Sequence, residues 1–195
     1  SSGRSISAGG DVAIHAESLT KLTSTAEGVS AGGLAVGASL VDISASPTAT
    51  AVAGSGSNIE ANHDISIEAR HNVDANGTTN PAFQSIANSK SSAGGLVGGT
   101  GADADITFSP QVTAYVDQNG VLRAGDSATI AVRALSDTDI VATSQGISGG
   151  ALAVGASLAD AQQAGVTRAY LEGNVLGTGN LTIEATATET IDTNT

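Results

Sequence analysis

The heptapeptide "LAVGASL" occurs twice in this chain, at residues 34–40 and again, without a change, at residues 152–158. Each copy follows a glycine-rich lead, and an aspartate follows each copy two residues later, Asp42 in the first and Asp160 in the second. Seven identical residues in a row indicate an internal repeat. A repeat has to be recognised first, because it decides the whole fold.

A third, degenerate copy lies between these two, in "SSAGGLVGGTGADADI" at residues 91–106. Its Leu96 follows Leu34 by 62 residues (96 − 34 = 62). With one inserted residue, Asp105 takes the place of Asp42. We therefore interpret residues 91–106 as the middle copy of a three-copy element.

A second element alternates with the first, and its copies begin 53, 63 and 53 residues apart. The four copies, which align without gaps, are ISAGGDVAIHA (6–16), IEANHDISIEA (59–69), LRAGDSATIAV (122–132) and VLGTGNLTIEA (175–185). Each begins with an apolar residue, passes through a short turn and ends in apolar and polar residues that alternate, the pattern of a half-buried strand. We expect one domain, residues 1–195, with units at about 6–58, 59–121 and 122–174 and a partial unit at 175–195.

The composition favours strands over helices. The chain has no Cys, Met or Trp and only two Phe and two Tyr, so Ala, Gly, Ser, Thr, Val and Ile have to fill a thin, evenly layered core. No segment sustains a helical period with caps. We predict an all-β fold, a right-handed parallel β-helix (β-solenoid) built from about three 53–63-residue repeats, with a β-sandwich pair as the alternative that the even spacing disfavours.

The repeat is longer than one coil of a narrow solenoid. We therefore expect two or three coils for each repeat. About eight or nine coils stacked at about 4.8 Å would give a rod roughly 40 Å long. A strand with the pattern of LAVGASL, small or apolar on both faces, is expected to be covered on both sides or to pack its outer face against a neighbouring chain or loop.

The charge of the chain restricts its partners. Seven Lys and Arg stand against nineteen Asp and Glu, a formal net charge of −12. Binding to nucleic acid needs clustered cations, so we expect no nucleic-acid partner. We also expect no membrane insertion, because no apolar run approaches the roughly 20 residues of a membrane span. The chain begins at Ser1 without a recognisable signal peptide, and we expect it to be a piece of a larger protein.

The stretch GGTGAD at residues 98–103 matches the first six positions of the calcium-binding nonapeptide G-G-x-G-x-D-x-U-x. That motif works in tandem, and here one copy stands alone with Asp105 at the eighth position, where a large apolar residue belongs. We interpret residues 98–105 as a structural strand and turn. Asp103 and Asp105 are kept as candidate calcium ligands, and no other cofactor or metal is expected.

The three histidines, His15, His63 and His71, come from different positions of the repeat. In "HDISIEARH" (63–71), His63 and Glu68 would point to opposite faces of a strand, which argues against a zinc site. We interpret all three histidines as solvated turn and surface residues.

Catalysis is not expected. The acids that a β-helix enzyme would use are scattered: Asp42, Asp103, Asp105, Asp117, Asp126 and Asp160. Four aromatic residues are few for a groove that stacks sugars, and the sequence holds no Ser-His-Asp arrangement, nucleophile elbow or P-loop. The absence of Cys excludes a disulfide framework, a thiolate metal site and a Cys nucleophile.

The pairing of GGLAVGASL and its trailing Asp with GxxIxAxxDIxIEA resembles the repeats of large filamentous-haemagglutinin-type bacterial adhesins, from Ile6 to about Ala185. The resemblance implies a right-handed β-helical shaft segment of a surface or secreted adhesin. Its role would be attachment between cells or to surfaces, in an extracellular or cell-surface location. The implied partners are neighbouring repeats of the same parent chain, and cell-surface glycans or proteins.

Two further hypotheses stay open at this stage. The alternative function is an extracellular carbohydrate-binding or polysaccharide-processing β-helix. Self-association is also expected, because both ends of a solenoid segment present unpaired strand edges.

Overall fold

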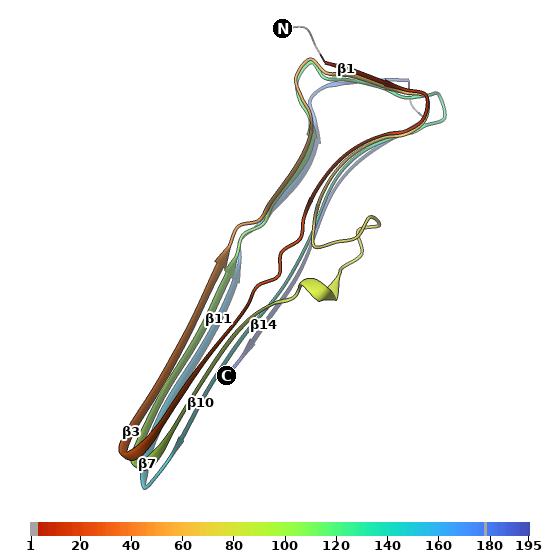
Figure 1. The fold of residues 1–195 in the computed structure, drawn as a ribbon. Coiled ribbons are helices and arrows are strands. Elements are labelled where there is room, and N and C mark those ends of the chain that lie inside the picture. Colours follow the sequence, from red (N-terminus) through yellow and green to blue (C-terminus); the bar gives the residue numbers. More distant parts are fainter. Residues whose placement is uncertain (1–3, 178) are drawn as a thin grey trace.

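The computed structural model describes residues 4–177 and 179–195, and nearly all of its regular structure is β-strand (Figure 1). Within this described part there is no α-helix, and the one 3-10 turn is η1 (Pro81–Phe83). The named strands pair only in parallel. They are β1 (Ser5–Ala8), β2 (Val12–Ser18), β3 (Thr23–Ala45), β4 (Thr48–Ala53), β5 (Asn58–Ala61), β6 (Ile65–His71), β7 (Ser85–Phe108), β8 (Gln111–Val116), β9 (Val121–Arg123), β10 (Thr129–Gly149), β11 (Leu152–Gln163), β12 (Val166–Leu171), β13 (Asn174–Leu176) and β14 (Asn180–Asn194).

Residues 6–58, 59–121 and 122–174 each pass once through the same series of neighbouring strands, and we call one such passage a circuit. Each sequence repeat therefore makes one circuit. The first residues of the four copies pair in register across the sheet β1-β5-β9-β13, in the order Ile6, Ile59, Leu122 and Val175. The expectation of two or three coils for each repeat is therefore wrong, because long strands take up the residues of a circuit. Four layers at about 4.8 Å span only roughly 15 Å, so the long axis in Figure 1 runs along the strands and not along the stack.

The upper part in Figure 1, which we call the head, is three-sided. Its sides are the sheet β1-β5-β9-β13, the sheet β4-β8-β12 and the strands β2-β6-β10-β14. Alternate residues of each strand point inward. They are buried in the second circuit and in β9 and β10 of the third, with Ile65, Val112 and Leu122 as examples, whereas Ala169 and Leu171 of β12 are partly buried. Each row of inward residues contacts the row above it, so the layers together form one core.

The lower part, which we call the blade, has two facing layers (Figure 1). The chain runs down the first layer, reverses at the tip and returns along the second layer. The first layer holds residues 23–32, 85–95, 140–149 and 191–194, and the second holds residues 34–45, 97–108 and 152–163.

Small side chains let the two layers of the blade approach closely. A Cβ at Gly37 would lie 2.7 Å from the carbonyl oxygen of Ser92, and a Cβ at Gly28 would collide with the carbonyl of Ala38. The hydroxyls of Ser39 and Ser89 are hydrogen-bonded at 2.7 Å inside the blade. The inner face of LAVGASL therefore needs small residues, because the facing layer leaves no room for larger ones.

The second circuit is longer than the first because a loop, residues 72–84, leaves the stack. Asn72 holds its base: the Asn72 side chain accepts from Thr20 N–H at 2.8 Å and donates to the Thr20 carbonyl at 3.1 Å. The loop covers the outer side of β10, where Leu135 lies against Gly77 and Asp139 accepts from the Gln84 side-chain amide. Ten additional residues are thus accommodated without a change of register.

Two details of the sequence alignment are wrong. Leu34 pairs with Val97, so Leu96 lies at the blade tip, one residue before its predicted place. The ungapped alignment sets Ile65 against Ala128 of the third unit. In the structure Ile65 pairs with Ile130, two residues further along the chain. The predicted equivalence of Asp42 and Asp105 is confirmed by their pairing.

Candidate functional site

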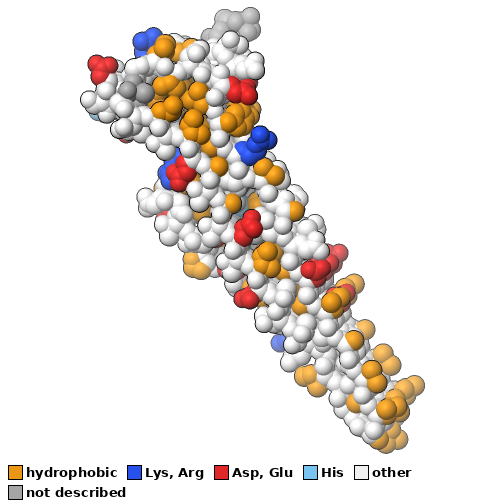
Figure 2. Space-filling model, turned by 180° about the vertical axis from the view of Figure 1, so that it is seen from behind, with side chains coloured by type: hydrophobic (Ala, Val, Ile, Leu, Met, Phe, Trp, Pro, Cys, Tyr) orange, Lys and Arg blue, Asp and Glu red, His pale blue; other side chains and the backbone are white. Residues whose placement is uncertain are grey.

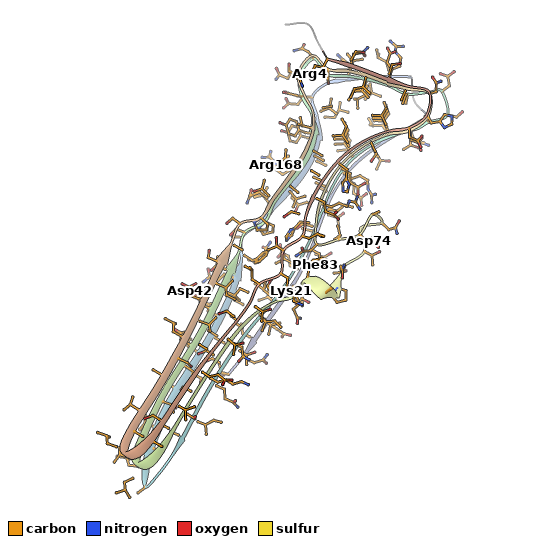
Figure 3. The ribbon with its side chains drawn as sticks, in the orientation of Figure 1. Arg4, Lys21, Asp42, Asp74, Phe83 and Arg168 are labelled. Atoms are coloured by element: carbon orange, nitrogen blue, oxygen red, sulfur yellow. The ribbon has the colours of Figure 1, made fainter. Side chains whose placement is uncertain are left out.

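Asp103 and Asp105 lie on the returning arm of β7, in the second layer of the blade. They alternate with Ala102, Ala104 and Ile106, which are buried between the layers. Both carboxylates therefore project from the outer face of the blade, as does that of Asp42 (Figure 3). The GGTGAD stretch is extended strand here, so of the expected strand and turn the strand is confirmed and the turn is wrong.

Asp105 is the middle member of a column of aspartates. Its register partners on either side are Asp42 and Asp160. Partial burial raises the pKa of the Asp105 carboxyl, and the neighbouring charges of Asp160, Asp42 and Asp103 raise it further. The carboxylates of this column therefore repel one another.

Asp103 is placed differently, because its register partners are the aliphatic residues Leu40 and Leu158. Calcium takes six to eight oxygen ligands. In the described ranges 4–177 and 179–195, no group of three or more His, Asp and Glu side chains is arranged to hold a metal ion. Calcium binding by Asp103 and Asp105 stays a hypothesis for solution measurement.

The three histidines lie in three different environments. His15 is exposed on β2 and contacts the Arg70 guanidinium, and His63 lies in an exposed turn. His71 is fully buried: its Nδ1 lies 3.1 Å from the Ser18 carbonyl oxygen, and its ring faces Phe108. Burial lowers the pKa of His71. The interpretation as a solvated residue is therefore wrong for His71, which follows the inward alternation of β6.

The turns that join the sheet β1-β5-β9-β13 to β2, β6 and β10 border an open hollow of about 450 Å³. Asp11 and Asp64 lie there, and each accepts a backbone N–H from the next circuit: Asp11 from Asp64 at 3.1 Å, and Asp64 from Thr129 at 2.7 Å. These carboxylates fasten one turn to the next. Asp126 lies in the third turn of the same hollow.

An ion-pair row crosses the outer face of the head. His15, Glu68, Arg133 and Glu184 occupy the same register position on neighbouring strands. Arg133 lies 2.9 Å from Glu184 and 3.7 Å from Glu68. Opposite charges on adjacent strands stabilise the pairing of β6, β10 and β14.

Tyr115 and Tyr170 stack on each other on the outer face of the sheet β4-β8-β12, with ring centroids 4.9 Å apart. Arg168 lies over the Tyr170 ring at 5.9 Å and projects from the same face (Figure 3). Each ring covers a face of the other, so the pair mainly stabilises the ladder. One face of each ring is therefore not available to a sugar.

The outer face of the second blade layer is the feature that sequence reasoning left undecided. Leu34, Val36, Leu152 and Val154 are 75, 70, 61 and 67% exposed there. The signal in the sequence is the double apolar face of LAVGASL. In the first copy Ala35 and Gly37 are buried in the blade, whereas in the second copy, on the edge strand β11, Ala153 and Gly155 are exposed as well. Figure 2 shows hydrophobic side chains gathered at the free end of the molecule.

The strands and their pairing define the structural class of the molecule. The chain is an all-β protein with parallel sheets. No family model matches it, no curated protein matches it, and no solved structure matches it. Across residues 4–177 and 179–195, no helix is long and apolar enough to cross a membrane.

Proposed function

We propose that this chain is a structural, non-enzymatic segment of a large bacterial surface or secreted adhesin of the filamentous-haemagglutinin type. The observation that carries the proposal is the in-register pairing of equivalent repeat positions, Ile6 with Ile59 and Leu122 with Val175. Stacked units of this kind bury their apolar rows against one another and extend by adding circuits. The proposed extracellular location follows from the adhesin role.

The proposed architecture is a right-handed parallel β-solenoid with one circuit for each repeat. In Figure 1 the chain runs clockwise through each circuit and recedes from the viewer towards the C-terminus, which supports a right-handed coil. Parallel strands joined by a crossover are right-handed in nearly all known cases.

The dimensions favour a broad segment over a long one. A circuit of 53–63 residues adds only about 4.8 Å to the stack. The 21 residues of β10, by contrast, extend roughly 70 Å at about 3.3 Å per residue. A shaft built from such circuits is thick and stiff, and it presents wide lateral faces along its length.

The alternative, a carbohydrate-binding or polysaccharide-processing module, rests on one observation, the outward pair Tyr115 and Tyr170 with Arg168 beside it. Aromatic rings and a guanidinium are groups that contact sugars. The mutual coverage of the two rings makes this the weaker proposal.

Display on bacterial cells separates the two roles. Cells that carry the chain at their surface, with or without a sugar-binding domain fused to its outer end, are applied to a surface coated with that sugar and to a set of immobilised polysaccharides. A shaft segment predicts attachment only when the fused domain is present. Attachment by the chain alone, abolished by Tyr170→Ala, or release of shortened polysaccharide would overturn the shaft role in favour of the alternative.

A further inference from the structure

The outer face of the second blade layer consists of two aliphatic ridges with a furrow between them. The first ridge belongs to the first circuit and includes Leu34 and Val36, and the second belongs to the third circuit and includes Leu152 and Val154. Between Val36 and Val154 in register lies Gly99 of the second circuit. The next outward position of that circuit is also a glycine, Gly101, and the outward residues at the two ends of this glycine pair are Val97 and Asp103.

The fold itself does not require these two glycines. A Cβ at Gly101 would meet no atom within 4 Å, and a Cβ at Gly99 would make one ordinary contact, 3.9 Å from Val36 Cγ2. Neither is among the residues with a positive φ. Gly98, one residue away, faces inward, and its Cβ would lie 3.0 Å from the Gly149 carbonyl oxygen. Packing within the chain thus explains Gly98 but leaves the furrow unexplained.

We propose that two copies of this chain associate face to face through this surface, with a ridge of each copy lying in the furrow of the other. Neighbouring strands lie about 4.8 Å apart, so the two ridges are roughly 10 Å apart and the furrow is one row of side chains wide. A ridge of Val and Leu side chains has that width. An offset of one circuit along the stack lets the first-circuit ridge of one copy lie in the furrow of its partner, while its own furrow receives the third-circuit ridge of the partner.

The charges on the same face determine the orientation. The column of Asp42, Asp105 and Asp160 closes the ridged area on the side away from the tip. When two copies lie with their blade tips pointing in opposite directions, their aspartate columns lie at opposite ends of the contact. A parallel arrangement would place eight carboxylates against one another, because each copy contributes Asp103 and the three carboxylates of the column.

The area and chemistry of the face favour a second copy as its occupant. Seven large aliphatic side chains at about 60–120 Å² each would bury roughly 400–850 Å² on each copy; they are Leu34, Val36, Leu40, Val97, Leu152, Val154 and Leu158. That is close to the roughly 800 Å² per partner of a standard interface. The outward positions of this layer carry no Lys or Arg to attract anionic lipid and no aromatic residue of the kind found at membrane interfaces.

Sedimentation equilibrium of the 195-residue chain over a wide concentration range tests the proposal. We expect a monomer–dimer equilibrium that Val36→Asp combined with Val154→Asp weakens by at least about 30-fold, the effect of hot-spot residues. The control is Val29→Asp, a residue 83% exposed in the first layer of the blade, which should change the dimer dissociation constant less than about threefold.

Gly101→Leu is the sharper variant, because it adds apolar surface while it fills the furrow. Interlocking ridges predict that this variant weakens the dimer at least about tenfold, a loss typical of interface residues that matter. A stronger dimer would show unspecific adhesion and overturn the proposal.

Two other results would also overturn it: a monomer at every concentration, or a dimer that Val36→Asp with Val154→Asp leaves unchanged. The second result would assign the contact to the strand edges at the ends of the stack. Thermal melts of each variant show whether it is folded, and the inference stands or falls separately from the adhesin role.

Discussion

Ile59 and Leu122 are direct partners on the parallel strands β5 and β9, although 63 residues separate them (122 − 59 = 63). In the same sheet Ile6 and Ile59 are partners across 53 residues (59 − 6 = 53). The loop 72–84 takes the ten additional residues out of the stack. Units of unequal length therefore share one register, and the circuit is the structural unit of the chain.

Removal of one whole circuit should leave a folded protein. Deletion of residues 59–121 joins Asn58 to Leu122, and since Asn58 pairs with Val121, the first circuit can stack directly on the third. We expect a cooperative thermal melt, followed by circular dichroism, with a lower midpoint because one interface between layers is lost. Deletion of residues 59–90, about half a circuit, is the control and should abolish cooperative unfolding. Equal melts for the two deletions would contradict this account.

The close approach of the blade layers predicts a strong effect of one methyl group. Gly37→Ala places a Cβ 2.7 Å from the Ser92 carbonyl oxygen, so the layers have to move apart. We expect a loss of about 1–3 kcal/mol in the free energy of unfolding, measured by urea denaturation. The matched control is Gly101→Ala in the same layer, where a Cβ meets no atom within 4 Å. If both substitutions have the same effect, the layers are not packed as described.

Asp137 makes the stability of the protein depend on pH. Burial raises the pKa of this carboxyl from 3.8 to about 6, with a contribution from Asp139, and one of its oxygens has no hydrogen-bond partner. Because the folded pKa lies above the unfolded one, the stabilising contribution is complete below about pH 4 and is lost as the pH rises through about 6. Asp137→Asn should therefore raise the melting temperature at pH 7.5, and the gain should shrink towards pH 4.

Asp126→Asn, at an exposed turn position, is the control for that series and should change the melting temperature little at either pH. A gain from Asp137→Asn that is the same at pH 4 and pH 7.5 would show that charge is not its cause.

The aspartate column gives a direct test of the calcium hypothesis. Neighbouring carboxylates raise the pKa of Asp105, so Asp105→Asn should raise the melting temperature in EDTA at pH 7 by removing repulsion. We expect the wild-type melt to be the same in EDTA and in millimolar calcium. A calcium-dependent rise that Asp105→Asn or Asp103→Asn abolishes would instead make these residues ligands.

The sequence predicts the strand faces well and the arrangement of strands less well. The alternation in residues 122–132 identifies which residues are buried, but it does not reveal that Ile65 pairs with Ile130 and not with Ala128. A shift of two residues keeps every side chain on its own face, so the apolar pattern is the same for both registers. Only the longer turn before β10, visible in three dimensions, distinguishes them.

The sequence does not predict the number of circuits in each repeat, for a related reason. Inward and outward side chains alternate with a period of two both in the arm that runs to the tip and in the arm that returns. In the sequence, the two layers of a blade therefore have the same pattern as strands of separate coils. The Gly-rich leads before Leu34 and Leu152 mark the reversal at the tip. The candidate site was equally ambiguous, because a strand that is small or apolar on both faces fits a buried strand and a docking face alike.

A cysteine pair tests the central claim, one in-register circuit for each repeat, most directly. Thr50 and Thr113 are partners on β4 and β8 and face outward, at a spacing of about 4.8 Å that a disulfide can bridge. The chain has no Cys of its own, so the double variant Thr50→Cys with Thr113→Cys can be oxidised and read by mass spectrometry. We predict rapid, intramolecular disulfide formation in this pair and little in the out-of-register pair Thr50→Cys with Gln111→Cys. No disulfide in the first pair, or equal yields in both, would contradict the stacking described here.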